Sequence, residues 1–473
     1  MSDVVKVINS SLNFIYNNVL SIAMLVLLIV VGAFLTFKLR GMQFFRFGHI
    51  AKNTAGSLFQ KNLHAKDSGS VSPFQAVTTA LAGTIGTGSI AGVATAIYAG
   101  GPGAVFWMWV SALLGMVTKY SEIVLSLKYR EKNELGAWVG GPMYYISKGL
   151  KQKWLAVLFA IFAMIACIGT GNTTQSNSIA SVFETNFHIA PWITGIVLTA
   201  ITCAVILGGV KRIASVNEKL VPIMAVFFII SSVAALIFNA SSIPAALTLI
   251  FKEAFNFKAA AGGVVGYGIF SAMRYGVGRG VFTNEAGLGS APIAHAASNT
   301  KDPVKQGFWG AFEVFITTIV ICTMTALVVL TSNVYTDAFS AGKHPEFNGA
   351  VLSSAAFGEA LPYVGNVIIS VATVFFALST ILGWAYYGEV SITYLFKSRQ
   401  KKAIFVYRLV YVAFVFIGAV ASMDTIWLIA DCFNALMALP NLIALIALSG
   451  VVVAATKHHF NKKKHIHVKR NKR

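Results

Sequence analysis

Four glycines lie close together inside an apolar stretch of the chain that is long enough to cross a bilayer. They are Gly83, Gly86, Gly88 and Gly92, within the run LAGTIGTGSIAG at 81–92. A glycine costs about 1 kcal/mol relative to alanine in a helix interior, so this run favours an opening in the helix. Backbone groups freed at bilayer depth are tolerated only where they line a cavity or are buried in protein. The run is therefore a candidate ligand site.

An opened helix can bind a zwitterion because it offers both donors and acceptors. The N–H groups at the start of a half-helix attract an anion, and the unwound carbonyls attract a cation. We expect a carboxylate to bind N–H groups around Thr87 and Gly88, with the hydroxyl of Ser89 as a further donor. The alternative is that the small residues only allow helices to pack closely.

Two further apolar segments carry polar side chains. One contains the unbroken polar run NTTQSNS at 172–178, and there Asn172, Gln175 or Ser176, and Ile179 could share one helix face. Gln175 is the candidate for ligand contact because an amide both donates and accepts. The other segment places the hydroxyls of Ser379 and Thr380 side by side, and oxygen ligands suit sodium. Alternatively, these side chains hydrogen-bond between helices or to their own helix.

The composition requires a membrane around these segments. The chain has 473 residues, of which 56% are hydrophobic and 11% charged, and apolar runs of about 20 residues recur along it. We predict an all-α polytopic membrane protein of about eleven transmembrane helices. The expected spans lie near 18–37, 73–100, 103–127, 154–181, 190–210, 219–239, 262–292, 307–331, 365–396, 404–421 and 426–455.

The net charge of +20 indicates the topology. Most of the lysines and arginines fall in alternate loops and in the tail 457–473, so the N-terminus is expected outside and the C-terminus in the cytoplasm. The tail resembles a nucleic-acid patch in isolation. Directly after a last span it is instead expected to touch anionic membrane lipid, and no nucleic-acid partner is expected.

The spans divide into one extra helix followed by two sets of five. An odd number of spans in each set means that the second set is inverted, and each set begins with a glycine-rich span, as in transporters. We therefore expect an N-terminal helix and basic loop at 1–72, one repeat at 73–239, a second at 240–456 and the basic tail at 457–473. The halves share no obvious residue-by-residue identity, so this repeat is topological.

Four stretches resemble one known family, the alanine or glycine:cation symporters, often called sodium:alanine symporters. They are SPFQ with AGTIGTGSIAGVATAI (72–97), GNTTQSNSI (171–179), RYGVGRGVFTNEAGLGSAP (274–292) and NALMALPNL (434–442). The resemblance runs from about residue 14 to 455. It implies a LeuT-like core of ten helices in two inverted sets of five, with one helix in front. Ser89 stands where asparagine is expected in this family.

The resemblance also implies site residues. It supports Gln175 as a substrate contact and assigns the side-chain pocket to Phe270, Ser271, Met273 and Trp384. By the LeuT-like architecture, the backbone carbonyls of Ala82, Ile85 and Phe376 complete a sodium site with Ser379 and Thr380. Taken singly, the aromatic residues could be only packing.

Charged residues inside spans are costly and need a role. For Arg279 and Glu285 we expect a cytoplasmic gate or a structural ion pair. The function expected overall is sodium-coupled symport of a small neutral amino acid, alanine or glycine, at the inner membrane, with sodium as the coupling ion and no cofactor. Proton coupling, serine or glutamine as substrate, and a channel remain alternatives. The chain lacks the motifs of zinc hydrolases, serine hydrolases and ATP-driven pumps, so an enzyme is not expected.

Overall fold

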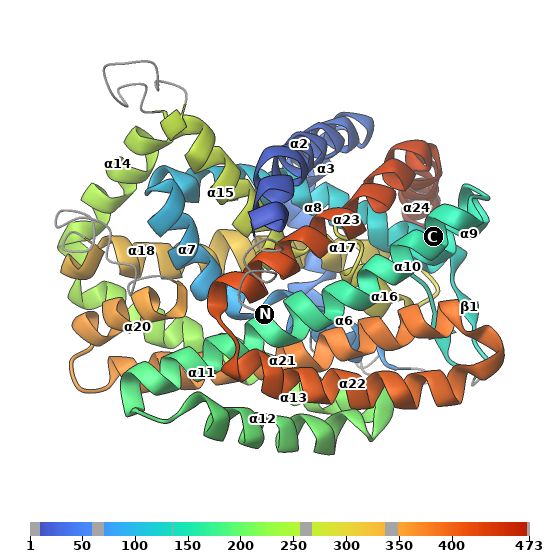
Figure 1. The fold of residues 1–473 in the computed structure, drawn as a ribbon. Coiled ribbons are helices and arrows are strands. Elements are labelled where there is room, and N and C mark those ends of the chain that lie inside the picture. The colour runs from blue at the N-terminus through green and yellow to red at the C-terminus, as the bar shows by residue number, and fades with distance from the viewer. Residues whose placement is uncertain (1–9, 59–70, 135, 256–266, 336–348, 471–473) are drawn as a thin grey trace.

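The computed structural model describes residues 10–58, 71–134, 136–255, 267–335 and 349–470, and most of them are helical. The helices form one bundle (Figure 1). Eight of the helical stretches in the described part are long and apolar enough to span a membrane. Three further expected spans, 73–100, 190–210 and 262–292, coincide with helices that are interrupted or shorter. The structure is consistent with eleven spans, and the prediction of an all-α membrane protein is confirmed.

The first half of the chain begins with the extra helix, and its core begins with a broken one. Pro73 opens this broken helix, and Ser72 and Gln75 form a reciprocal capping box before it, with bonds of 3.1 and 3.2 Å. The elements are η1 (Tyr16–Leu20), α2 (Ser21–Lys38), α6 (Pro73–Thr84), η3 (Thr87–Ser89), α7 (Ala91–Gly100), α8 (Gly103–Tyr129), α10 (Lys153–Ile168), η4 (Gly169–Thr173), α11 (Thr174–Phe187), α12 (Pro191–Ile206) and α13 (Gly209–Phe238).

The second half also begins with a broken helix. Its elements are α15 (Tyr267–Asn284), α16 (Ala291–Ala296), α17 (Pro303–Val314), η6 (Phe315–Cys322), α18 (Thr323–Leu330), α21 (Gly365–Leu395), α22 (Gln400–Val420), α23 (Met423–Ala447) and α24 (Ser449–Arg470). The expected last span at 426–455 is thus divided at Leu448, and the basic tail continues as a helix through Arg470.

Short elements connect the spans. Between α2 and α6 lie α3 (Met42–Phe45), α4 (Phe47–Asn53) and η2 (Ala55–Ser57). An antiparallel hairpin of β1 (Glu131–Lys132) and β2 (Trp138–Val139) follows α8 and leads to α9 (Pro142–Gly149). The remaining connections contain η5 (Ala240–Ser242), α14 (Ile243–Ala254), α20 (Gly349–Ala360) and η7 (Lys397–Arg399).

The glycines of the expected span 262–292 have two different roles. Gly276 and Gly280 lie in the regular helix α15, and a Cβ there would come within 2.3 and 2.4 Å of Ala104 and Ser111 of α8. They therefore allow close packing and do not open the helix. The interruption comes later, at Glu285–Ser290, where Gly287 and Gly289 have φ of 92° and 81°.

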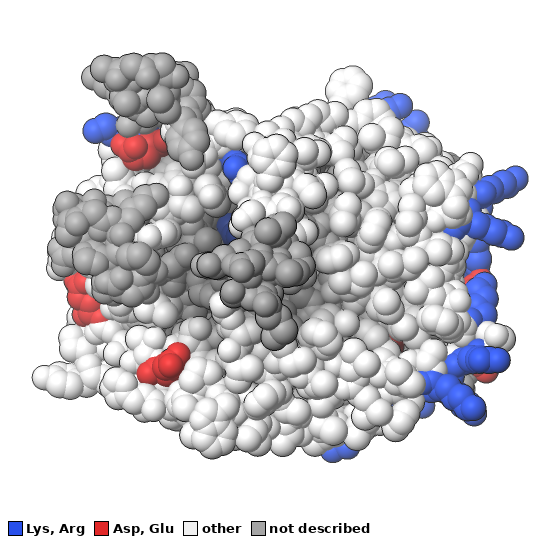
Figure 2. Space-filling view, in the orientation of Figure 1, with Lys and Arg blue, Asp and Glu red and all other residues white. Residues whose placement is uncertain are grey.

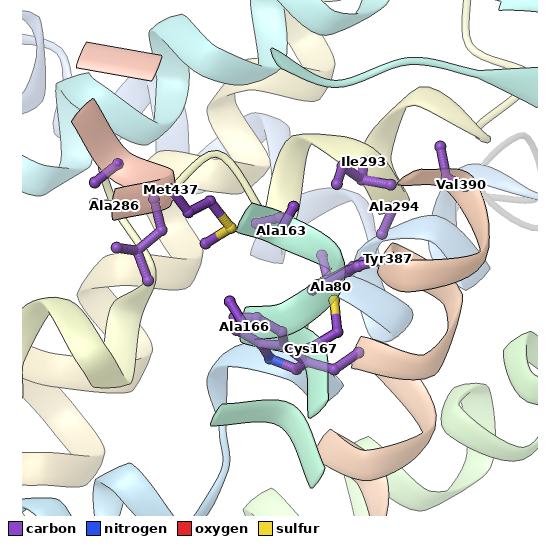
Figure 3. Close-up of a cluster of buried hydrophobic side chains, with 14 of the residues drawn as sticks. Ala80, Ala163, Ala166, Cys167, Ala286, Ile293, Ala294, Tyr387, Val390 and Met437 are labelled. Atoms are coloured by element: carbon purple, nitrogen blue, oxygen red, sulfur yellow. The ribbon is translucent and has the colours of Figure 1, made fainter. Parts of the chain in front are cut away.

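Small buried side chains let the central helices approach one another. Figure 3 shows Ala80 of α6, Ala163 and Cys167 of α10, Ala294 of α16 and Tyr387 of α21 in one apolar cluster. Close approach of these helices brings the two interruptions to the centre of the bundle.

Candidate functional site

The first interruption separates α6 from α7, as the glycines at 81–92 predicted. Ile85 and Gly86 leave the helical conformation, with φ/ψ of −89°/72° and −113°/−165°. Two hydroxyls from the second half satisfy carbonyls after the opening. Thr325 donates to the Ser89 carbonyl at 2.8 Å, and Ser353 donates to the Ile90 carbonyl at 3.0 Å. No pattern in the sequence identified either residue.

Gln175 reaches this interruption from α11. Its Oε1 accepts from the N–H and the hydroxyl of Thr87 at 3.1 and 2.9 Å, and its Nε2 donates to the Thr170 carbonyl at 2.9 Å. The π-helical turn η4 precedes Gln175. Single π-helical turns inside α-helices are frequent at functional sites. Gln175 is 1% exposed.

The other polar residues of this run face elsewhere. Asn172 donates to the Tyr411 carbonyl of α22 at 2.6 Å, and the Ser176 hydroxyl lies against Gly418 of α22. Of the two alternatives for the shared face, Ser176 therefore lies with Asn172 on the side of α22, and Gln175 does not. Gln175 points to the opening.

Three of the expected sodium ligands lie together between α6 and α21: the Thr380 hydroxyl and the Ala82 and Phe376 carbonyls. The Thr380 hydroxyl donates to the Ala82 carbonyl of α6 at 2.8 Å and to the Phe376 carbonyl at 2.9 Å. Ser379 points differently, because its hydroxyl lies 2.9 Å from the Phe376 carbonyl and 3.4 Å from the Met224 sulfur. Ile85 follows α6 directly at the opening. Thr380 is thus the side chain that links the two helices.

Buried side chains form hydrogen bonds with the second interruption just before its start and in its middle. Lys119 of α8 donates to the Asn284 carbonyl at 3.0 Å. Gly287 donates its N–H to Glu122 at 3.1 Å and accepts from the Asn441 side chain at 2.9 Å. Lys119 and Glu122 therefore bond to different parts of this segment.

The two interruptions meet at Glu285 and Trp384. Trp384 of α21 donates its indole N–H to Glu285 at 2.8 Å and lies 3.4 Å from the Gly83 carbonyl at the end of α6. Glu285 also accepts from the Ser290 hydroxyl at 2.5 Å. The Trp384 side chain packs closely against η4. A Cβ added to Gly171 would lie 2.1 Å from the Cβ of Trp384.

Three expected pocket residues lie away from the interruption. Ser271 donates to the Ala99 carbonyl at the far end of α7, and Phe270 is 38% exposed. Met273 is partly buried among the apolar core. These residues occupy the early turns of α15, whereas the first interruption, between α6 and α7, contacts the last turns of α15. The grouping of Phe270, Ser271 and Met273 with Trp384 in one substrate pocket stays a prediction.

Phe282 and Thr283 of α15 contact the first interruption at Gly88. A Cβ on Gly88 would lie 2.9 Å from the Thr283 hydroxyl and 3.1 Å from the Phe282 ring. Phe282 stacks on Trp427 of α23, with the ring centroids 4.9 Å apart. The motif quoted above contained Phe282 and Thr283, but sequence spacing alone did not identify which turn of α15 packs here.

Arg279 and Glu285 do not pair with each other. Arg279 forms a bidentate salt bridge with Asp431 of α23, at 3.1 and 2.8 Å, and Glu285 bonds Trp384 and Ser290. Glu285 has a left-handed φ of 57° and lies beyond the last residue of α15, the helix that carries Arg279. Both residues nevertheless have buried polar partners, as charged groups inside spans require.

Comparison with known proteins agrees with this architecture. The family model described as the sodium:alanine symporter family matches residues 4–473. The chain is 46% identical over 459 residues to the sodium/alanine symporter AgcS of Methanococcus maripaludis, covering 96% of this chain and 97% of AgcS. It is 38% identical over 441 residues to the probable sodium/glutamine symporter GlnT of Bacillus subtilis, covering 93% and 88%.

Among solved structures, MhsT in complex with L-phenylalanine is similar in fold. Its TM-score is 0.57 at 13% identity, and the match covers 82% of this chain and 89% of MhsT. A Na⁺-coupled sialic acid symporter matches with a TM-score of 0.53 at 10% identity, over 92% and 98%. These likenesses confirm the LeuT-like fold. The chain belongs to the sodium:alanine symporter family, and it is a membrane transporter and not an enzyme.

Proposed function

We propose that this chain imports a small neutral amino acid, alanine or glycine, together with sodium by alternating access. The observation that carries the proposal is the contact of Thr380 with the Ala82 carbonyl beside the opened helix. It gathers oxygen atoms of α6 and α21 next to backbone groups that can bind a zwitterion. The name of the Methanococcus maripaludis relative, a sodium/alanine symporter, supports the same substrate and ion.

In this proposal the substrate carboxylate binds donors at Thr87, Gly88 and Ser89. The side chains of Gln175, Trp384, Phe270, Ser271 and Met273 border the bound molecule, and Phe282 is added to them because it adjoins Gly88 at the opening. Sodium binds the Ala82, Ile85 and Phe376 carbonyls with the hydroxyls of Ser379 and Thr380. The site is buried, since Thr87 and Ser89 are 0% exposed, so binding requires the helices to move apart on one side at a time.

Sodium provides enough free energy for this work. One monovalent cation that crosses about 100 mV yields about 2.3 kcal/mol, and a tenfold gradient adds about 1.4 kcal/mol, enough for several-hundredfold accumulation. One sodium ion for each substrate is therefore sufficient.

The division into inverted sets at 73–239 and 240–456 belongs to the same proposal, because alternating access moves one set of helices against the other.

The proposed orientation is N-terminus outside and C-terminus in the cytoplasm of the inner membrane. Its support is the distribution of charge. In Figure 2, lysines and arginines gather at the end of the molecule that carries α9 and α24, and acidic side chains are visible at the opposite end. Basic residues are retained on the cytoplasmic side of membrane proteins.

The test is uptake of labelled alanine into proteoliposomes with sodium and pH gradients imposed separately. Uptake driven by the sodium gradient alone and competed by unlabelled glycine supports the proposal. Uptake driven only by the pH gradient contradicts sodium coupling, and stronger competition by glutamine or serine contradicts the assigned substrate.

A further inference from the structure

A wide groove lies at the basic end of the molecule, between the end of α2, the helices α3 and α4, and α24. Its volume is about 1110 Å³. Lys38, Arg40 and Arg46 line one wall and Lys457 lines the other, and no aspartate or glutamate is among the lining residues. Basic pockets beside transmembrane helices are a known way to hold acidic head groups.

One wall of the groove is held in place by a tight turn. Arg40 and Gly41 have left-handed φ of 55° and 60°, which turns the chain sharply from α2 into α3. Gln43 is buried and donates to the Thr36 hydroxyl at 2.8 Å and to the Leu113 carbonyl at 3.3 Å. The wall is thus fixed to α2 and α8, so its cations are positioned by the fold.

The cations of the groove have no acidic partner. Lys38, Arg40, Arg46 and Lys457 are exposed, and in the part of the chain that the structure describes none of them forms a salt bridge. The Arg46 guanidinium lies 3.9 Å from the centre of the Phe460 ring, which joins the two walls. Among the described residues, the positive charge of the groove is therefore not neutralised by a carboxylate.

Apolar side chains stand beside this charge. Phe37 is 84% exposed at the end of α2, and Phe45 is 86% exposed on α3 and lines the groove. Exposed phenylalanines next to basic residues are typical of segments that lie at the boundary of head groups and acyl chains. A free phosphate ion would neutralise the lysines and arginines but would leave these rings in water.

We propose that this groove binds one anionic phospholipid. Its phosphate lies between Arg46 and Lys457, and the part of an acyl chain nearest the head group lies against Phe45. The ligand chemistry is a phosphate ester joined to an apolar tail. The bound lipid connects α24 to the loop that follows the extra helix α2. This site is separate from the proposed transport site at the helix interruptions.

A neighbouring groove on α24 shows why the absence of a carboxylate matters. Its volume is about 710 Å³, and Lys128, Lys301 and Lys305 line it together with Asp302. Burial opposes ionisation of Asp302, but the hydrogen bond from His459 and the N–H groups of Lys305 and Val304 outweigh it and lower the pKa of the carboxyl. This second groove thus contains its own anion, unlike the first.

The experiment measures lipid retention by native mass spectrometry of the full chain in detergent. Phosphatidylglycerol and phosphatidylcholine are added separately to wild type, to the double variant Arg46→Gln with Lys457→Gln, and to a control, Lys401→Gln with Lys402→Gln. The control removes the same charge from exposed positions on α22 that do not line the groove. A parallel series adds inorganic phosphate as competitor, and Phe45→Ser tests the apolar wall.

Wild type and control should retain phosphatidylglycerol in preference to phosphatidylcholine. The groove variant should lose about 30-fold in phosphatidylglycerol binding at low salt, from the removal of two positive charges, and Phe45→Ser should weaken lipid binding without creating phosphate binding. An equal loss in the control, or no loss in the groove variant, overturns the proposal. Displacement of the lipid by millimolar phosphate would show that the site is a phosphate site instead. Thermal unfolding of each variant confirms that it is folded.

Discussion

The side-chain oxygen of Gln175 accepts hydrogen bonds from both the N–H and the hydroxyl of Thr87, at 3.1 and 2.9 Å. These are the donors that we assign to a substrate carboxylate. Gln175 therefore holds both donors at the opening. Because its Nε2 also donates to the Thr170 carbonyl of η4, Gln175 links the conformation of η4 to the donors of the proposed substrate site.

Replacement of Gln175 tests this link. Gln175→Ala removes the acceptor for Thr87 and the donor to the Thr170 carbonyl, so alanine should bind more weakly by about 1–3 kcal/mol. A binding titration in detergent measures the change. The matched control is Asn177→Ala on the same helix. The Asn177 amide donates to the backbone carbonyls of Gly418 and Ala421, which lie away from the interruption. Unchanged binding in a folded Gln175→Ala protein would remove Gln175 from the site, and tighter binding would show that Gln175 competes with substrate.

The hydroxyl of Thr380 should set the affinity for sodium. Thr380→Ala removes the only side-chain oxygen in our proposed ligand set that bonds α6, so half-maximal uptake should need more sodium, whereas Thr380→Ser should retain the wild-type value. The addition of Ser379→Ala to Thr380→Ala should abolish sodium-driven uptake. Thr373→Ala is the control, since that hydroxyl bonds its own helix at Ile369. Uptake by the double variant with wild-type sodium dependence contradicts this ion site.

Gly86 should tolerate no side chain. A Cβ there would lie 2.4 Å from the Thr380 hydroxyl and 3.2 Å from the Gln175 amide oxygen. Gly86→Ala should therefore reduce both sodium and alanine binding, measured by titration of each. Gly278→Ala provides the comparison, because a Cβ at this helical position meets no atom within 4 Å and alanine favours a helix by up to about 1 kcal/mol. Equal behaviour of the two variants would contradict a packed interruption at Gly86.

Sequence patterns predicted the parts of this architecture that depend on local chemistry. The glycines at 81–92 predicted the opening after α6 because backbone freedom is a local property. Thr380 and Gln175 were found as polar groups in apolar segments. Phe282, Thr283 and Ser353 were missed, because their roles depend on which turn of one helix faces another. The partner of Arg279 was missed for a similar reason, since Asp431 lies on another helix, α23.

Trp384 should limit the size of the substrate. Its side chain is 1% exposed between Gly171 and Glu285, beside the interruption. Trp384→Ala should open space there and admit leucine or methionine, with about 0.8 kcal/mol gained for each methylene buried, at a cost of about 3–5 kcal/mol in stability. Trp384→Phe keeps most of the ring and should keep the preference for alanine. Competition of labelled alanine uptake by unlabelled amino acids measures the order, and an unchanged order in Trp384→Ala contradicts a pocket role.

The buried pair of Arg279 and Asp431 should behave as a unit. Removal of one partner leaves the other charge without compensation, so Arg279→Met or Asp431→Leu alone should each destabilise the protein by about 3–5 kcal/mol. The combined variant should recover much of that loss, because two apolar side chains can replace a buried ion pair. Thermal unfolding in detergent measures the cycle. Lys397→Ala is the surface control, since Lys397 is 65% exposed and 3.8 Å from Glu131, and its change should stay below about 1 kcal/mol. Additive losses in the double variant would show that Arg279 and Asp431 stabilise the helices independently.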